Sequence, residues 1–245
     1  MKIEVILHPA ELREFAQRAH PETVCVVFDV LRATTTMVTA LASGVDALLP
    51  VATVEEAFSL RERTPGALLG GERHGDRVEG FDFGNSPVEY SGSPGATIVM
   101  TTTNGTGAIQ ACKGAECVLV AALLNLKAVA EVVRARNPER LVVVCSGTGA
   151  DVAMEDVWAA GALIDEFFDG DQFDWSDSAH CARGLFLDWP DSECALRAST
   201  NGRALLAKGR ELDLIWCAAL DRYSVVAEFK DGAVRALAEM EGVVA

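Results

Sequence analysis

Short runs of apolar and β-branched residues recur along the chain, separated by polar stretches with helical spacing. Such runs are typical of strands buried on both faces of a sheet. A first strand is predicted at residues 1–8, where apolar and polar positions alternate. Further strands are predicted at residues 24–28, 45–51, 96–100, 117–121, 141–145 and 212–217.

Helical patterns lie between several of these strands. Thr53 and Glu56 have the spacing of a capping box and predict a helix over 54–63. Asn125 precedes a helical pattern over 126–136, apolar positions recur at three-to-four spacing over 152–168, and region 169–199 is expected to be helical. The alternation predicts an α/β sheet covered on both faces, and we expect residues 1–245 to form one domain, with two subdomains as the alternative.

The pattern breaks between residues 70 and 95 into a Gly- and Pro-rich stretch that is too long for a simple connection. Long irregular loops in compact domains usually carry function. We take Glu72 as a candidate metal ligand, and Arg73 and Asn85 as candidate contacts for anionic groups. Any one residue of these types is more often a solvated loop residue. The polar candidates of this loop are Glu72, Arg73, Arg77, Asp82, Asn85 and Ser86.

Charge narrows the range of partners. The chain has 36 acidic and 21 basic residues, a net charge of −15, and its Lys and Arg are scattered. Such a chain repels a phosphate backbone, so we expect no nucleic-acid partner. A small anionic ligand remains compatible, provided that its pocket is locally cationic through a metal, arginines or helix N-termini.

Apolar stretches and cysteines indicate a cytoplasmic protein. The longest apolar runs fall short of the ~20 residues that cross a bilayer, so no membrane span is expected. The N-terminal residues lack the apolar region and cleavage site of a signal peptide. Seven cysteines without a CxxC pair predict reduced, mostly structural thiols.

Two predicted strands each end in polar residues that pass into a helical pattern. Asp29 follows the strand at 24–28 and is placed to hold a hard cation, while Arg32 is suited to bidentate phosphate binding. The hydroxyls of Thr34 and Thr35 are candidates to cradle phosphate oxygens. Asp29 as a helix cap with Arg32 as its surface partner fits the pattern equally well.

The strand at 96–100 has the same arrangement and is followed by an Asn-Gly turn. Thr103, Asn104, Gly105 and Thr106 form the second candidate anion site. An ordinary strand-to-helix connection is the alternative, because Asn-Gly is a common turn signal. Finding the strand–hydroxyl–helix arrangement twice favours a phosphate site.

Hydrolysis of a phosphate ester at such a site would require a metal. Its rate enhancements reach ~10²¹, whereas a helix N-terminus favours an anion by only about 0.3–2 kcal/mol. Oxygen ligands such as Asp29 and Glu72 suit Mg²⁺. Glu155 and Asp156, in the first turn of a predicted helix, either reach the same cleft or stabilise the helix dipole.

Three other phosphatase motifs fit poorly. The Arg73-His74-Gly75 triplet of histidine phosphatases lacks a second histidine in a suitable setting. Cys145 begins a loop like that of tyrosine phosphatases, but position 151 is Asp where the phosphate-binding Arg is needed. The haloacid dehalogenase motif needs a second Asp two residues after Asp29, where this chain has Leu31.

Four ordered blocks resemble the signature of the 2-phosphosulfolactate phosphatases. They are DVLRATTT at 29–36, GER at 71–73, GFDFGNSP at 80–87 and TTNGT at 102–106. The resemblance is weaker at 146–148 and 155–156, and fades after about residue 169. It implies a three-layer α/β/α fold with a largely parallel or mixed sheet and a Mg²⁺-dependent phosphoric monoester hydrolase that converts 2-phosphosulfolactate to sulfolactate in coenzyme M biosynthesis.

The resemblance leads to a specific hypothesis for the site. Mg²⁺ is expected on Asp29 and Glu72, with Glu155 or Asp156, and Asp29, Arg32 and Asn104 are the catalytic candidates. Direct attack by water and an aspartyl-phosphate at Asp29 both remain open. The substrate-binding candidates are Thr34, Thr35, Arg73, Asn85, Ser86, Thr103, Gly105 and Thr106.

Alternatives remain for the substrate and for the functional class. Other phosphorylated 2-hydroxy acids suit the same anion sites as 2-phosphosulfolactate. A non-catalytic anion-binding or regulatory protein and a phosphotransferase on similar ligands are the alternative functions. A homodimer is the default expectation for an enzyme of this size.

Overall fold

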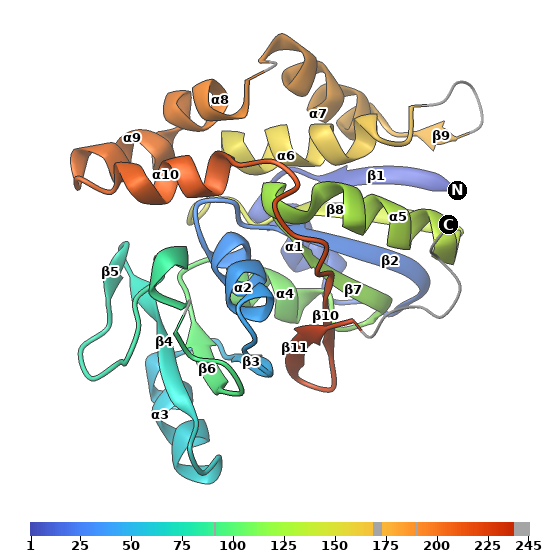
Figure 1. The fold of residues 1–245 in the computed structure, drawn as a ribbon. Helices are drawn as coiled ribbons and strands as arrows, with labels where there is room; N and C mark the ends of the chain where they lie inside the picture. The colour runs from blue at the N-terminus through green and yellow to red at the C-terminus, as the bar shows by residue number, and fades with distance from the viewer. Residues whose placement is uncertain (91, 169–172, 190, 238–245) are drawn as a thin grey trace.

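An eleven-stranded mixed sheet runs through the computed structural model, which describes residues 1–90, 92–168, 173–189 and 191–237 (Figure 1). Its strand order is β5-β4-β6-β3-β11-β10-β7-β2-β8-β1-β9. The strands are β1 (Lys2–Ile6), β2 (His20–Phe28), β3 (Ala47–Pro50), β4 (Leu68–Arg73), β5 (Asp76–Arg77), β6 (Thr97–Thr101), β7 (Ala115–Ala121), β8 (Arg140–Cys145), β9 (Asp174–Trp175), β10 (Ala227–Lys230) and β11 (Ala233–Ala236).

The sheet contains two parallel blocks. One consists of β4, β6 and β3, and the other of β7, β2, β8, β1 and β9. The β10–β11 hairpin lies between them and pairs antiparallel with β7 on one side and β3 on the other. Three successive antiparallel pairings therefore separate the blocks, so the strands of one block run in the opposite direction to those of the other.

Helices cover both faces of this sheet, which confirms the predicted three-layer α/β/α fold. In Figure 1, α6 to α10 lie along the top of the view, and α3 lies with β4 and β6 at the lower left. The helices are α1 (Pro9–Phe15), α2 (Ala33–Ala42), α3 (Val54–Arg63), α4 (Gly105–Ala111), α5 (Leu126–Arg136), α6 (Met154–Asp165), α7 (Asp177–Asp188), α8 (Ser192–Ala198), α9 (Thr200–Ala207) and α10 (Glu211–Ala218), with 3₁₀ turns η1 (Pro87–Tyr90) and η2 (Leu123–Asn125).

Strand β2 shows how the sequence builds the two apolar cores. Val24, Val26 and Phe28 join the core formed with α5, α6, α7, α8 and α10. Cys25 and Val27 point to the opposite face and join the core formed with α1, α2 and α4. Because successive side chains of a strand alternate between faces, a continuous apolar run is what a doubly covered central strand requires.

Most predicted elements are present. Strands at the predicted runs from the N-terminus to 141–145 are confirmed, and so is α3 with its capping box between Thr53 and Glu56. The predicted helices at 126–136 and 152–168 correspond to α5 and α6. The predicted helical region 169–199 holds α7 and α8, but it also holds strand β9, so the helical prediction is wrong there. Its residues 169–172 and 190 lie outside the described part of the chain.

The predicted strand at 212–217 is wrong, because these residues belong to helix α10. A short apolar run does not by itself separate a buried strand from a helix. Leu214 and Cys217, three residues apart, are buried, whereas Leu212 and Ile215 are 76% and 45% exposed. This is helical spacing with one face against the core.

Residues 70–95, which we predicted to be an irregular loop, include the end of β4, the strand β5 and the turn η1, and hydrogen bonds hold the stretch in place over its described residues. The N–H of Gly71 donates to the carbonyls of Phe83 and Gly84 at 3.2 and 3.1 Å. Gly71 has φ 137°, and a Cβ there would lie 1.9 Å from the carbonyl oxygen of Thr101. Only glycine therefore fits where β4 passes β6. Residue 91 lies outside the described residues.

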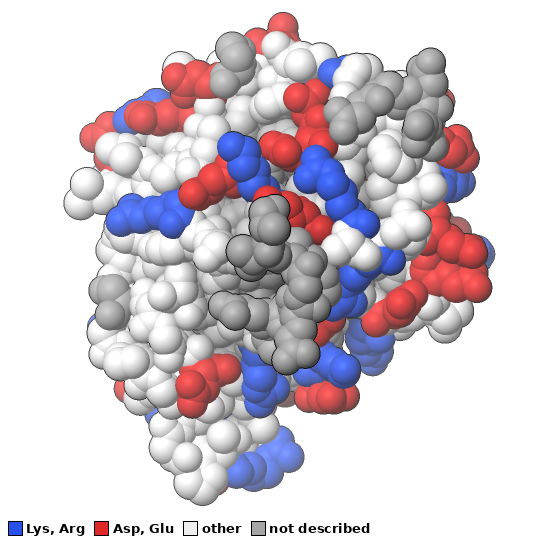
Figure 2. All heavy atoms as spheres, turned by 45° about the vertical axis from the view of Figure 1, so that its right-hand side comes forward, with Lys and Arg blue, Asp and Glu red and all other residues white. Residues whose placement is uncertain are grey.

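The viewed surface is mixed in charge, and most of the cysteines are buried. Figure 2 shows acidic and basic side chains side by side, without a large area of one sign on that face. Among the described residues, no helix is both long enough and apolar enough to cross a bilayer. All seven cysteines are free, and only Cys181 and Cys194 are exposed, so most thiols have the structural setting that we predicted.

Candidate active site

Buried carboxylates gather where strands of both parallel blocks end. Asp29 follows β2, and Glu72 is the penultimate residue of β4; their exposed fractions are 7% and 6%. Glu155 and Asp156, in the first turn of α6, are 1% and 2% exposed. Charged side chains are rarely buried this deeply without a function or a partner, so each requires an account of its contacts.

Asp29 lies against the beginnings of two helices. Its Oδ1 accepts a hydrogen bond from the N–H of Ala33 at 3.2 Å. A Cβ on Gly105 would lie 2.7 Å from Asp29 Oδ2 and 2.6 Å from the Cβ of Ala33, so glycine is required for α4 to approach this closely. The loop after β6 and the carboxylate after β2 are thus in direct contact, as the two sequence motifs predicted.

The electrostatic setting of Asp29 favours a proton or a cation. Burial, together with the nearby carboxylates of Glu72 and Glu155, raises the pKa of Asp29 to about 7, although the hydrogen bond from the N–H of Ala33 opposes the shift. A carboxylate with such neighbours gains stability from any positive charge placed between them.

Glu72 links two loops at the edge of the site. Its Oε2 accepts from the N–H of Gly75 at 2.6 Å, and its Oε1 accepts from the N–H of Thr103 at 2.7 Å. The carboxylate thereby holds the turn between β4 and β5 against the loop that leads from β6 into α4. A carboxylate oxygen has more than one acceptor position, so these bonds leave room for a cation.

Glu155 and Asp156 differ in how their oxygens are satisfied. Asp156 accepts from Val30 N–H at 2.9 Å, Ser146 hydroxyl at 3.0 Å and Gly147 N–H at 3.2 Å, and so joins the ends of β2 and β8. Glu155 Oε1 accepts from Asn201 at 2.6 Å, but its buried Oε2 has no partner. Burial raises the pKa of both carboxyls.

The donor set fits a hydrated hard cation. In the part of the chain that the structure describes, no three His, Cys, Asp or Glu residues form a preassembled metal cage. Mg²⁺ does not need one, because it keeps several waters and binds through one or two carboxylates. The unpartnered Oε2 of Glu155, together with Asp29 and the nearby Glu72 carboxylate, would supply such oxygens, whereas the oxygens of Asp156 are already used by the fold.

Residues distant in the sequence hold the side chain of Arg32 in place. Its side chain is 3% exposed, forms an ion pair with Asp213 of α10, and donates to the carbonyl of Gly75 at 3.1 Å. Asp213 also accepts from the hydroxyl of Ser86 at 2.5 Å. The surface pairing that was the alternative for Arg32 is therefore excluded, and three of its five N–H donors have no partner among these contacts.

The hydroxyls of the proposed cradle have main-chain partners. Thr34 donates to the carbonyl of Asp29, and Thr35 to the carbonyl of Val30 at 2.8 Å; both side chains are fully buried. Thr106 donates to the carbonyl of Thr102 at 3.2 Å. These three hydroxyls hold the strand-to-helix turns in shape, so we leave them out of the phosphate contacts.

The remaining candidates have mixed settings. Arg73 donates to the carbonyls of Glu72 and Ala52 and to the hydroxyl of Thr101, so its guanidinium is used in holding strand ends together. Asn104 accepts from the N–H of Gly149 at 3.0 Å. Asn85 is 5% exposed, and its buried Oδ1 has no partner.

Three further loop residues lie at the surface. Thr103 is exposed beside the Glu72 contact that its N–H makes. Arg77 and Asp82 are also exposed, and they contact each other through the guanidinium of Arg77 and the carbonyl of Asp82 at 3.4 Å. Neither the Arg77 guanidinium nor the Asp82 carboxylate contacts a buried carboxylate of the site.

Sequence reasoning missed the residues that α9, α10 and the segment between them contribute. Asn201 reaches Glu155, Asp213 reaches Arg32, and Lys208 and Arg210 reach the turn at 74–76. Two signals were available: a charged residue, Asp213, within an apolar run, and the repetition of Thr103-Asn104-Gly105 as Thr200-Asn201-Gly202.

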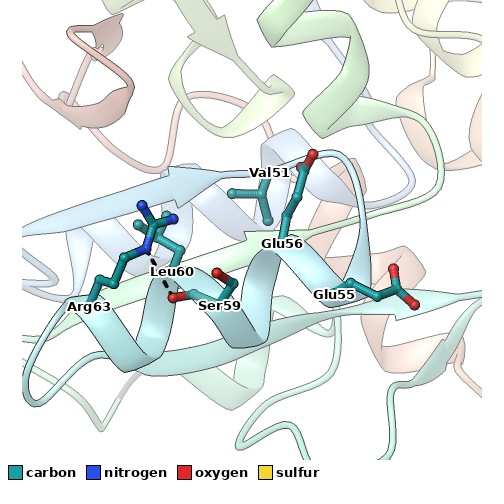
Figure 3. Close-up of a pocket in the computed structure, with 6 residues that line it drawn as sticks. All are labelled: Val51, Glu55, Glu56, Ser59, Leu60 and Arg63. Carbon is teal, nitrogen blue, oxygen red and sulfur yellow. Dashed lines mark hydrogen bonds between the residues drawn. The ribbon is translucent and has the colours of Figure 1, made fainter.

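Two cavities lined by described residues lie elsewhere. Figure 3 shows one of about 530 Å³ between Val51 and α3, with Glu55, Glu56 and Arg63 around it. The other, of about 850 Å³, lies beside the start of β7 and the β10–β11 turn. Neither is lined by Asp29, so the buried carboxylates, and not cavity volume, identify the candidate site.

Comparison with known proteins identifies the family of this chain. The family model described as 2-phosphosulpholactate phosphatase matches residues 10–232. Three relatives carry the name probable 2-phosphosulfolactate phosphatase. The protein of Carboxydothermus hydrogenoformans is 39% identical over 93% of each chain, that of Deinococcus radiodurans is 42% identical over 82% of this chain and 85% of its own, and that of Clostridium perfringens is 35% identical over 96% of each. This chain belongs to the 2-phosphosulpholactate phosphatase family.

Proposed function

We propose that the chain is a Mg²⁺-dependent phosphatase that hydrolyses 2-phosphosulfolactate, or a related 2-hydroxy acid phosphate, to the hydroxy acid and inorganic phosphate. The observation that carries the proposal is the set of buried carboxylates Asp29, Glu72 and Glu155, one with an unpartnered oxygen, beside the fixed guanidinium of Arg32. Family membership and the names of the relatives support the ester as substrate.

Asp29 would hold the metal directly, and Glu72 and Glu155 would hold it directly or through its waters. A bound Mg²⁺ supplies neutralisation of the phosphoryl oxygens and orientation of the attacking group. Water is largely excluded around Asp29 and Arg32, which are 7% and 3% exposed, and electrostatic contacts are stronger in such an environment.

Arg32 and Asp29 perform the steps that the chain itself contributes. The ion pair with Asp213 fixes the guanidinium plane of Arg32, so its remaining N–H groups are oriented in advance toward phosphoryl oxygens. The Asp29 carboxylate either attacks phosphorus, expelling the hydroxy acid and leaving an aspartyl-phosphate for hydrolysis, or orients and deprotonates the water that attacks directly.

Inorganic phosphate release tests the proposal. The panel is 2-phosphosulfolactate, phospholactate and phosphoglycerate, each with Mg²⁺ and with EDTA. We expect chelator-sensitive release, fastest for the physiological ester. Binding without turnover of any ester would support the anion-binding alternative, and transfer of phosphate to an acceptor in preference to water would identify a phosphotransferase.

The stability of the metal-free protein is expected to fall as pH rises from about 4 to about 7. The folded-state pKa of Asp29 is raised from 3.8 to about 7, so in this window the native state binds more protons than the unfolded chain. Stability then decreases with pH, by on the order of 4 kcal/mol for a shift of this size. Mg²⁺ should restore stability, with a larger effect at about pH 8 than at about pH 5.

Urea denaturation with EDTA and with saturating Mg²⁺ measures this dependence. Asp29→Asn is the control, since an amide cannot titrate and should flatten the pH profile. A Mg²⁺ effect equal at both pH values would contradict the assignment of Asp29 to the metal site.

Replacing Asn201 by Leu is expected to raise the Mg²⁺ concentration needed for half-maximal activity by about 10–100-fold. The side chain of Asn201 fixes Glu155 at 2.6 Å, and groups that orient metal ligands have effects of this size. Thr148→Val is the matched control, because Thr148 is the other partner of the same amide and does not touch Glu155. Equal effects of the two variants would contradict a role in orienting Glu155.

A further inference from the structure

Three basic side chains converge on the turn at residues 74–76, between β4 and β5. Lys208 donates to the carbonyl of His74 at 2.7 Å and to Asp76 at 2.8 Å. Arg210 donates to the carbonyl of Gly75 and to Asp76, the latter at 2.7 Å. Arg32 donates to the same Gly75 carbonyl at 3.1 Å, so two guanidinium groups share one acceptor.

Two carboxylates pair with the three cations at this turn. Asp213 pairs with Arg32, and Asp76 is the carboxylate shared by Lys208 and Arg210. The third carboxylate at the turn, Glu72, accepts from the N–H of Gly75 and forms no ion pair with these cations in the described structure. Cations held together in this way repel one another, and an added anion would relieve that repulsion.

The outer two cations are accessible. The side chains of Lys208 and Arg210 are 39% and 28% exposed, in contrast to 3% for Arg32. Their carboxylate partner Asp76 is 65% exposed, and ion pairs at such exposure contribute little to stability. A ligand anion can therefore compete with Asp76 for both basic groups at small cost.

The turn also borders the carboxylate site. The N–H of Gly75 donates to Glu72, whose charge in turn raises the pKa of Asp29. Figure 1 shows α9 and α10 above the hairpin of β4 and β5, which is the arrangement that brings Lys208 and Arg210 to the turn. One side of the turn faces the proposed phosphoryl site, and the other carries accessible positive charge.

We propose that Lys208 and Arg210, flanking Arg32, form the subsite that binds the acidic arm of the substrate, a sulfonate or carboxylate group. This inference rests on the proposed function, because it assigns one end of the substrate to these residues while the phosphate lies on Arg32 and the carboxylate-bound metal. Arg210 suits a planar or tetrahedral oxyanion through its two-pronged geometry, and Lys208 adds a compact charge.

A purely structural clamp is the competing explanation, and Asp76 separates the two. If Lys208 and Arg210 only hold the turn, then removing the charge of Asp76 loosens the clamp and weakens ligand binding. If they bind the acidic arm, Asp76→Asn removes a competitor, and ligand affinity rises. The two explanations thus predict opposite signs for one substitution.

The experiment measures equilibrium binding of 3-sulfolactate by titration calorimetry in EDTA, with lactate as the ligand that lacks the sulfonate. We expect Arg210→Met and Lys208→Met each to weaken sulfolactate binding about tenfold or more, the effect of losing a charged hydrogen bond. Arg210→Lys should keep more affinity than Arg210→Met, and lactate should be affected less than sulfolactate. Asp76→Asn should tighten sulfolactate binding.

Arg197→Gln is the matched control. Arg197 is a basic residue of the same helical layer, 33% exposed and paired with Glu211, but it does not contact the turn. Its substitution should leave the affinity unchanged. Equal weakening by Arg210→Met and Asp76→Asn, or no effect of either basic substitution, would overturn the proposal.

Failure of this subsite and failure of the phosphatase proposal remain distinguishable. The binding measurement needs neither metal nor turnover. Sulfolactate binding that depends on Arg210, in a protein that releases no phosphate, would retain the subsite and reject the phosphatase. Phosphate release by a protein whose sulfolactate affinity is insensitive to Arg210 would retain the phosphatase and reject the subsite.

Discussion

Asp29→Asn is expected to lower kcat/KM for phosphate release by about 10³-fold or more. Asp29 is the proposed metal ligand and nucleophile or base, and loss of several kcal/mol of transition-state stabilisation corresponds to this factor. The substitution conserves shape, and an amide oxygen can still accept from the N–H of Ala33. The fold should therefore survive while the chemistry is lost.

Steady-state and single-turnover phosphate release measure this effect. Asp46→Asn, at an exposed position before β3, is the control that should retain full activity. Near-wild-type turnover of the Asp29 variant would reject both mechanisms that use this carboxylate. In the wild-type enzyme, a phosphoryl group found on Asp29 after acid quench would reject direct attack by water.

Arg32→Ala is expected to destabilise the fold by about 3–5 kcal/mol as well as to abolish turnover. The substitution leaves Asp213, which is 5% exposed, as a buried charge without its cation, and breaking a buried ion pair has costs of this size. Urea denaturation measures the stability, and phosphate release measures the activity.

A double substitution separates the two roles of Arg32. Arg32→Met with Asp213→Leu removes both charges, so most of the lost stability should return, whereas activity should not. The exposed pair Arg197–Glu211 is the control, since neutralising it should cost less than about 1 kcal/mol. Recovery of turnover in the double variant would contradict a role for Arg32 in binding the phosphoryl group.

Local patterns predicted the elements whose structure is decided locally. The continuous apolar run of β2 and the capping box at Thr53 and Glu56 carry their own signals, and both elements are present. Residues 212–217 were misassigned because a six-residue apolar run has no unambiguous period. What decides it is the packing of Leu214 and Cys217 against a distant core, which no local pattern contains.

The residues of the candidate site likewise fall into those that a local pattern predicted and those that it did not. Asp29, Glu72 and Gly105 were found because each follows or ends a strand, where the functional residues of α/β sheets are common. Asn201, the partner of Glu155, is 46 residues away from it in the chain, and Asp213, the partner of Arg32, is 181 residues away from it. Hydroxyls such as that of Thr34 were overassigned because a sequence does not show whether a side chain bonds its own backbone.

The position of the β10–β11 hairpin bears on how the chain is made by the ribosome. This hairpin is formed by residues 227–236, yet it joins the two parallel blocks in the middle of the sheet. Until it emerges, β3 and β7 of the nascent polypeptide each have an unpaired, apolar edge, which is a hazard for intermolecular association. We therefore expect chains truncated before residue 227 to aggregate in translation extracts, and a chaperone that shields strand edges to suppress this.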